Sequence, residues 1–355
     1  MNIIPCGGFR SVRVKYTLTL CVFLLLAGVY CPSARANVTI NPIYDTTILS
    51  DSNAATIESS IQTSINNLEA DLSNNVTIDI TFKEMSTGLG ESNTVYYDTS
   101  YASYLTALQH NQILTSNDNL AIASLGSGTA VNPVNGNTNI IATAALLEAL
   151  GVNVQGDGQL TGIVTGTISL NTSIMNLSRT GTQNPSDYDI QAVTTHELDE
   201  VVGSIGGAGS SLLSGTGNAV GPLDLFRYSA SGVRSYTQST TAVSYFSING
   251  GATDLVHFNQ NGTFDGSDFG DWGNGNTPAQ QDGNSPPQVQ DAYGDPGVDT
   301  NLGANEMTAY DIVGWNLTAQ GQTLEGIPEP KSIYLIAAGG LIAVVIHRRR
   351  SRKAA

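Results

Sequence analysis

A histidine and two glutamates stand at a metal-binding spacing in the stretch THELDEVVG, residues 195–203. Residues four apart lie on one face of an α-helix, so a helix here would let His196 and Glu200 bind the same metal ion. Glu197 lies one position further round, where its carboxylate can take a proton from a bound water. The motif H-E-x-x-H uses this arrangement for hydrolysis. Glu200 stands where the second histidine would be. Because a carboxylate is also a zinc ligand, Glu200 is compatible with a metal site, but its harder ligand set makes the identity of the metal less certain.

Such a site needs a third protein ligand further along the chain. Gly206, three residues after Gly203, has no side chain with which to bind a metal. Asp224 and Glu306 are the two candidates. Asp224 also fits a capping or strand-end aspartate, and Glu306 also fits the first-turn acid of a helix, which the helix dipole stabilises. His257, in the apolar stretch DLVHF, fits a structural histidine. Spacing alone does not choose among them.

The elements that must position these residues alternate along the first half of the chain. Three segments alternate as strands do, at residues 38–44, 76–82 and 160–170. Three others carry apolar residues at helical spacing, at residues 53–72, 101–114 and 142–150. A fourth helix is predicted to begin near Asp187 with Ser186 as its cap, to carry the motif, and to end at Gly203. This order predicts a mixed α+β domain.

Composition changes after the motif helix. Residues 37–203 read as one subdomain of strands and helices, whereas residues 204–326 are rich in Gly, Asn, Asp and Ser and read as a loop-rich C-terminal subdomain. In the latter, the stretch FDGSDFGDWG places Asp265, Asp268 and Asp271 in a glycine-rich loop. That loop fits a Ca²⁺ site or, equally well, a solvated turn.

The first 36 residues have the pattern of an export signal. A basic start is followed by the apolar run LTLCVFLLLAGV and by the small-x-small sequence that ends at Ala36. We therefore expect cleavage after Ala36 by a signal peptidase, and a body that lies outside the cytoplasm.

The last segment, residues 327–355, has a short apolar run between Pro328-Glu329-Pro330 and a terminal arginine cluster. The apolar run covers only residues 333–346, shorter than the roughly 20 residues that cross a bilayer squarely, but its basic flank favours a span with a cytoplasmic end. The three elements resemble the PEP-CTERM sorting signal of Gram-negative bacteria. The resemblance implies processing by an exosortase-type transpeptidase and delivery to the cell surface or extracellular matrix.

Between the two end segments, residues 37–326 contain no cysteine, which excludes disulfides, cysteine nucleophiles and thiolate metal sites. This part has four basic and 29 acidic residues, a net charge of −25 against −16 for the whole chain. So acidic a surface argues against nucleic acid or anionic lipid as a partner.

Several stretches together resemble a family of exported bacterial zincin-like metallopeptidases. These are HELDEVVG, PLDLFRYSASGVRSY, YFSINGG and NEMTAYDIVGW, which begin at residues 196, 222, 245 and 305. The resemblance implies a zincin-like fold and a zinc-dependent endopeptidase. It also implies that His196 is a ligand and Glu197 the general base, with Glu200 at the place of the second ligand.

The predicted function is therefore hydrolysis of protein or peptide substrates by metal-activated water, in a secreted and surface-sorted protein. One alternative is a non-catalytic matrix or adhesion protein on a zincin scaffold that has lost its metal. Another is a calcium-stabilised module that binds extracellular polysaccharide. Metal bound at His196 argues against both alternatives, and calcium alone favours the second.

Overall fold

The computed structural model describes residues 38–126, 130–154, 158–159, 163–203, 220–237, 239, 241–260, 269–273 and 286–326. The predicted export signal with Ala36, the sorting segment with Pro328, Glu329 and Pro330, and the loop aspartates Asp265 and Asp268 lie outside these residues. Within the described residues, no helix combines the length and the apolarity that crossing a bilayer requires. All of them belong to one compact unit, residues 37–355, and the subdomain boundary near residue 203 stays a prediction.

A mixed four-stranded sheet with the order β1-β2-β8-β3 is part of the α+β fold. Its strands are β1 (Thr39–Tyr44), β2 (Thr77–Glu84), β8 (Ile163–Leu170) and β3 (Gly90–Thr94). The first three run parallel, and β3 pairs antiparallel with β8 at the edge, with Gly90 opposite Leu170. In β2, Ile78, Ile80 and Phe82 are buried at alternate positions, as expected for a strand with one face against the core.

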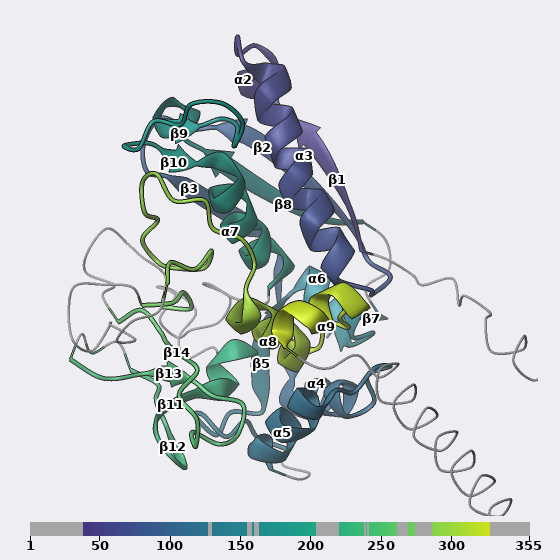
Figure 1. Ribbon diagram of the computed structural model, residues 1–355. Helices are drawn as coiled ribbons and strands as arrows, with labels where there is room; N and C mark the ends of the chain where they lie inside the picture. The colour runs from purple at the N-terminus through teal and green to yellow at the C-terminus, as the bar shows by residue number, and fades with distance from the viewer. Residues whose placement is uncertain are drawn as a thin grey trace, which may run out of the picture. The chain divides into compact units, whose positions relative to one another are not determined.

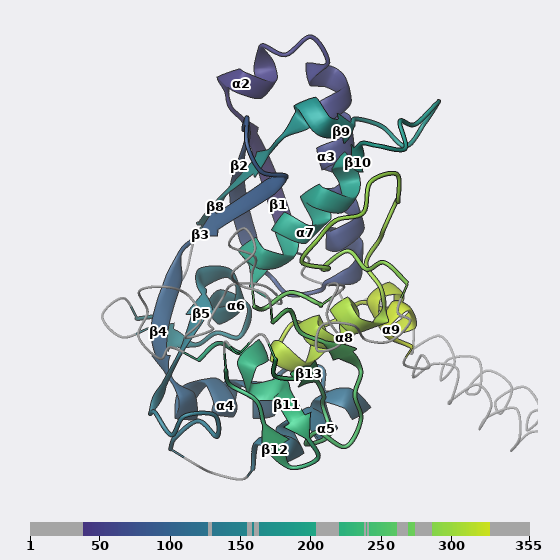
Figure 2. The ribbon, with the colours of Figure 1, turned by 90° about the vertical axis from the view of Figure 1, so that its left-hand side faces the viewer.

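Two helices cover one face of this sheet, as Figure 2 shows: α3 (Ala54–Asp71) and α7 (Ile190–Val202). In α3, Ile57, Ile61, Ile65 and Leu68 are fully buried at the spacing of one helical face. The other helix, α7, carries the motif and packs against α3, β3 and β8. The sheet and α3 therefore fix the position of the helix that holds His196.

The N-terminus of α7 differs from the predicted one. Ser186 was expected to cap a helix that begins near Asp187, but the helix begins at Ile190 and its cap is Asp189, which accepts hydrogen bonds from the Gln191 and Ala192 amides. Ser186 lies three residues too early, because the chain first forms the short strand β10 (Tyr188–Asp189) against β9 (Met175–Asn176).

The C-terminus of α7 is at Gly203, as predicted. Gly203 has φ 79°, a left-handed conformation that favours glycine. A Cβ atom at this position would also lie 2.2 Å from the hydroxyl of Thr143. That hydroxyl donates to the Val202 carbonyl and accepts from the Leu146 amide, so it joins the end of α7 to the start of α6 (Ala144–Ala149).

Below the sheet in Figure 1 lies a second group of elements. It comprises β4 (Tyr96–Ser100), β5 (Asn139–Thr143), α4 (Tyr101–Gln109), α5 (Ser116–Leu125), α6, α8 (Ala304–Val313) and α9 (Ala319–Glu325). Two helices are shorter than predicted. The helix expected over residues 101–114 ends at Gln109, and Ile113 instead donates its amide to Asn316. The helix expected over residues 142–150 begins at Ala144, because Ala142 belongs to β5, where it pairs with Tyr97 of β4.

The chain after α7 forms a small antiparallel sheet in the order β12-β11-β13-β14. Its strands are β11 (Arg227–Ala230), β12 (Val233–Arg234), β13 (Tyr245–Phe246) and β14 (Val256–His257). The remaining short elements are α2 (Thr46–Leu49), the hairpin of β6 (Asn153–Val154) with β7 (Gly158–Gln159), and 3-10 turns at Thr172–Ile174 and Leu223–Phe226.

Candidate metal centre

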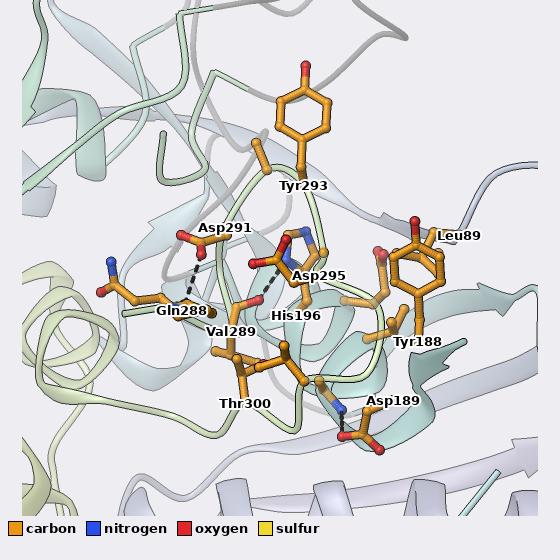
Figure 3. Close-up of a pocket in the computed structure, with 18 residues that line it drawn as sticks. Leu89, Tyr188, Asp189, His196, Gln288, Val289, Asp291, Tyr293, Asp295 and Thr300 are labelled. Atoms are coloured by element: carbon orange, nitrogen blue, oxygen red, sulfur yellow. Dashed lines mark hydrogen bonds between the residues drawn. The ribbon is translucent and has the colours of Figure 1, made fainter. Parts of the chain in front are cut away.

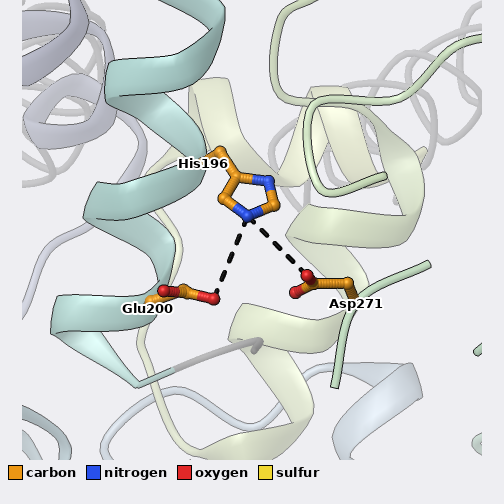
Figure 4. A group of neighbouring side chains, drawn as sticks. All are labelled: His196, Glu200 and Asp271. Carbon is orange, nitrogen blue, oxygen red and sulfur yellow. Dashed lines mark ion pairs between the residues drawn. The ribbon is translucent and has the colours of Figure 1, made fainter. Parts of the chain in front are cut away.

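Three ligand-bearing side chains meet beside the C-terminal half of α7 (Figure 4): His196, Glu200 and Asp271. Nε2 of His196 lies 3.9 Å from Oε1 of Glu200 and 3.8 Å from Oδ2 of Asp271. The three ligand atoms all lie within 4.8 Å of one another, and no other group of this kind occurs among the residues that the structure describes. His196 and Glu200 come from one turn of the helix, and Asp271 comes from the segment 269–273.

The spacing of these atoms fits a small divalent cation. Bond lengths of 2.0–2.2 Å in a tetrahedral zinc site place ligand atoms roughly 3.4 Å apart. The two distances from His196 therefore need to shorten by only about half an ångström, a shift that side-chain rotation supplies. The geometry thus accommodates an ion bound by one imidazole and two carboxylates.

The imidazole of His196 is held in the tautomer that binds metal. Its Nδ1 lies 3.0 Å from the carbonyl oxygen of Val289. A carbonyl only accepts hydrogen bonds, so Nδ1 carries the proton and the lone pair of Nε2 faces Glu200 and Asp271. A hydrogen bond from the far ring nitrogen to a carbonyl is the usual support of a metal-binding histidine.

The carboxylates of Glu200 and Asp271 each accept a hydrogen bond on one oxygen, and the other oxygen faces His196. Ser92, on β3, donates its hydroxyl to Oε2 of Glu200 at 2.5 Å, so Oε1 is the atom that faces the histidine. Gln290 donates its amide to Oδ1 of Asp271 at 2.9 Å, so Oδ2 faces the histidine. Each ligand therefore has a fixed orientation before any ion binds.

Glu306 positions Asp271 indirectly. Its Oε1 accepts from the indole of Trp272 at 3.0 Å, and its Oε2 accepts from the Gly303 amide at 2.9 Å. The Trp272 ring is fully buried and packs against Phe246, with ring centroids 5.6 Å apart. Burial raises the pKa of Glu306, which these hydrogen bonds partly offset. The residue next to Asp271 is thus anchored on two sides.

Glu197 lies beside the group and is buried between α7 and β3. Its exposed fraction is 5%. A Cβ atom at Gly90 would lie 2.2 Å from Oε1 of Glu197, so only glycine leaves room for this carboxylate. A buried carboxylate one helical position from a metal ligand is where a general base would be expected.

A cavity of about 140 Å³ opens next to His196 and Glu197 (Figure 3). It is lined by the start of β3 with the residue before it, by β10, by α7 and by the segment 287–300: Leu89, Gly90, Tyr188, Asp189, Ala192, Val193, His196, Glu197, Pro287, Gln288, Val289, Asp291, Ala292, Tyr293, Gly294, Asp295, Val298 and Thr300. The space is large enough for one amino-acid side chain and lies against the predicted base.

The two third-ligand candidates from the sequence do not belong to this group. Glu306 is the first-turn acid of α8. Asp224 lies in the 3-10 turn after Pro222, accepts from the Gly221 amide at 3.0 Å, and is 4.0 Å from Arg227. Burial raises the pKa of Asp224 to about 7, although Arg227 opposes the shift. Both carboxylates thus have the structural roles that were the alternatives to metal binding.

Sequence reasoning missed Asp271 as a partner of the helix ligands. It grouped Asp271 with Asp265 and Asp268 as a calcium loop, and those two residues lie outside the described part of the chain. The only available signal was an aspartate next to a tryptophan in an otherwise polar segment. His257 is also away from the group, since its Nε2 contacts Asp254 at 2.9 Å.

The chain matches no protein-family model, no curated protein and no solved structure.

Proposed function

We propose that the protein is an exported, zinc-dependent metallopeptidase with a zincin-like domain. The observation that carries this proposal is the meeting of His196, Glu200 and Asp271 within metal-binding distance, with Glu197 buried beside them on the same helix. Two of the three ligands and the base belong to the H-E-x-x-E motif.

The arrangement around the helix supports the zincin-like part of the proposal. The strand β3 runs antiparallel at the edge of the sheet, and its residues Gly90 and Ser92 contact Glu197 and Glu200. One side of β3 pairs with β8, which leaves its other side beside the cavity. An edge strand next to the reacting groups is suited to holding an extended peptide.

His196 Nε2, Glu200 Oε1 and Asp271 Oδ2 are the atoms that would hold the zinc ion. When bound, zinc polarises a peptide carbonyl and makes a coordinated water more acidic. Glu197 then accepts a proton from the attacking water and returns it to the amine of the departing peptide. Its burial against Gly90 keeps bulk water from competing for that proton.

Zinc suits this donor set better than calcium, because calcium takes six to eight oxygen ligands and no imidazole. The alternative of a non-catalytic matrix or adhesion protein gains support from the single imidazole, since two carboxylates with one histidine are a harder ligand set than zinc prefers.

We also propose that the two end segments direct the chain to the cell surface or matrix, with a signal peptidase and an exosortase-type transpeptidase as processing partners.

Metal content tests the proposal. The purified protein, dialysed against zinc and then against buffer, should hold about one zinc per chain, as expected for a mononuclear site. His196→Ala, Glu200→Ala and Asp271→Ala should each lose most of it, whereas Asp224→Asn should retain it. The absence of any bound transition metal in the wild type would overturn the proposal and favour the matrix protein.

Activity is tested with Glu197→Gln on casein or a peptide library. This variant should bind zinc as the wild type does and cleave at least about 100-fold more slowly, because the general base is missing. Equal cleavage by both proteins would show that Glu197 is not the base.

A further inference from the structure

The side chain of Gln290 lies between two of the proposed ligands. Its Nε2 donates to Oδ1 of Asp271 at 2.9 Å and lies 3.4 Å from Nε2 of His196. Gln290 is fully buried. Its Oε1 is also buried and has no hydrogen-bond partner among the residues that the structure describes.

An amide nitrogen is the right group for this place only while no cation is bound. Nε2 of His196 and Oδ1 of Asp271 are both acceptors, and an amide NH₂ has two hydrogens to donate. A cation held by the same ligands would face those hydrogens. The amide oxygen, meanwhile, is left buried without a donor, an arrangement that costs stability in a folded protein.

Rotating the amide by half a turn exchanges its oxygen and nitrogen without moving the rest of the side chain. The oxygen then takes the place that the nitrogen has now, 3.4 Å from Nε2 of His196, and Asp271 exchanges its hydrogen bond from this amide for a shared bond to the metal. We propose that Gln290 is a fourth protein ligand, which binds the metal through Oε1. This inference rests on the proposed metal centre and explains why a buried amide oxygen lacks a partner.

A fourth protein ligand has a consequence for the proposed activity. Catalytic zinc sites keep one position for water, whereas four protein ligands close a site. Gln290 takes the position that the attacking water needs, so the metal-loaded protein is partly latent: only the fraction of molecules in which Gln290 has withdrawn cleaves peptides. The same segment supplies the Val289 carbonyl to His196 and a wall of the cavity, so one movement would change all three.

Hydrogen bonds to α8 hold the segment around Gln290, and a movement of Gln290 must break them. The Gln290 backbone amide hydrogen-bonds to Glu306, and the Gln288 side chain accepts from Asn305 at 2.6 Å. Both contacts join the segment to the first turn of α8. Withdrawal of Gln290 must therefore break both contacts with α8.

The test compares wild type with Gln290→Met, which keeps the volume of the side chain and removes the amide. Cobalt(II) bound in place of zinc reports its ligands, because its visible absorption changes when one ligand, here an amide oxygen, is exchanged for another, here water. In Gln290→Met, water should bind the metal in place of the amide, so the absorption spectrum of the cobalt form should differ from that of wild type. The variant should also bind zinc about tenfold more weakly, as measured by competition with a chelator. Gln112→Met, the same substitution at an exposed glutamine after α4, should change neither.

The outcomes separate the inference from the proposed function. Metal bound by both proteins with the same spectrum and affinity would overturn the role of Gln290 and leave the metal centre intact. No metal in the wild type would overturn the centre and the inference together. Faster peptide cleavage by metal-saturated Gln290→Met than by wild type would support latency. Should Gln290→Met fail to fold, Gln290→Asn, whose amide is one methylene too short to reach, should show the same losses.

Discussion

At the scale of single residues, the candidate centre depends on groups that fix which atom of each ligand faces inward. The Val289 carbonyl sets the tautomer of His196, and the Ser92 hydroxyl selects Oε1 of Glu200. Such supports restrict the ligands before the ion arrives, and their loss commonly weakens metal binding by about 10–100-fold. The side chains that touch the ligands are therefore part of the site.

Gly90 gives a prediction at this scale. In Gly90→Ala the new methyl group would overlap Oε1 of Glu197, since an ideal Cβ lies only 2.2 Å from it. The carboxylate must turn away from its place beside the ligands. We expect kcat/KM for peptide cleavage to fall about 100-fold, because a misplacement near 1 Å costs that much, while zinc content is unchanged.

A neighbouring substitution controls for effects on the strand. Asn93→Ala changes an exposed side chain of β3 and should leave the rate as it is. Full activity in Gly90→Ala would mean that Glu197 does not act from the position that it has in the structure.

The sequence predicted the residues of the centre that lie close together in the chain and failed on the distant one. His196, Glu197 and Glu200 follow from helical geometry alone. Asp271 does not, because the fold brings it to the helix across 75 residues from His196, and no local pattern records that contact. Glu306 was named as a candidate ligand, but its structural place is an anchor for Trp272.

At the scale of elements, α7 depends on its N-terminal cap. Asp189 accepts from two backbone amides of the first turn and from Nε of Arg179 at 2.8 Å. It is almost completely buried. Removing it leaves two amides without their acceptor and takes away the carboxylate partner of Arg179, which keeps its hydrogen bonds to Asn301 and the Thr300 carbonyl.

We therefore expect Asp189→Ala to lower the free energy of unfolding by about 2 kcal/mol, from the lost cap and the lost charge-assisted hydrogen bond. Urea denaturation measures this. Ser186→Ala, at the cap position that the sequence suggested, should change it by less than about 0.5 kcal/mol. The reverse ranking would mean that the helix begins where the sequence predicted.

Element boundaries were the weaker part of the prediction for a physical reason. The strands near residues 40, 80 and 165 and the helix at residues 54–71 have strong periodicity, and each was predicted within a few residues of its bounds. The errors fall where tertiary pairing overrides local preference. Ala142 joins a strand because Tyr97 lies beside it, and Ile113 leaves a helix because Asn316 offers an acceptor.

At the scale of the whole molecule, three carboxyl groups meet where α5, α8 and α9 pack together. Asp118, Asp311 and Glu325 are all buried. Thr115 donates to Asp311, Asn117 donates to Glu325, and the Asp311 and Glu325 carboxyls hydrogen-bond to each other. Burial raises the pKa of Asp118 to about 6, that of Glu325 to about 7 and that of Asp311 to about 9, with the neighbouring carboxylates adding to the shift of Asp311.

These shifts predict stability that falls as pH rises. Between the ordinary pKa of 3.8 and the raised value of about 9 for Asp311, the folded protein keeps a proton that the unfolded chain releases, so each step in pH favours unfolding. Asp311→Asn should remove much of this dependence and raise the free energy of unfolding at pH 8 by about 1 kcal/mol or more.

Urea denaturation between pH 5 and pH 9 checks this expectation. The exposed Asp98→Asn serves as the matched control and should follow the wild-type curve. A wild-type stability that is flat or rises across this range would contradict the prediction.

The α+β class followed from the alternation of elements along the sequence, but the way in which the later part of the chain joins the earlier part did not. Ser73 bonds to Asn316, and Tyr310 donates to Asp199 on α7. These contacts join positions more than a hundred residues apart, and only the packed structure brings them together.

The proposed ligands come from two stretches that lie 71 residues apart, from Glu200 to Asp271. An ion held by both would cross-link α7 to the segment 269–273. When the ion is removed, this cross-link is lost, and we expect the backbone amides of residues 269–273 to exchange their hydrogens faster. The stability of the folded protein would then depend on the concentration of the metal.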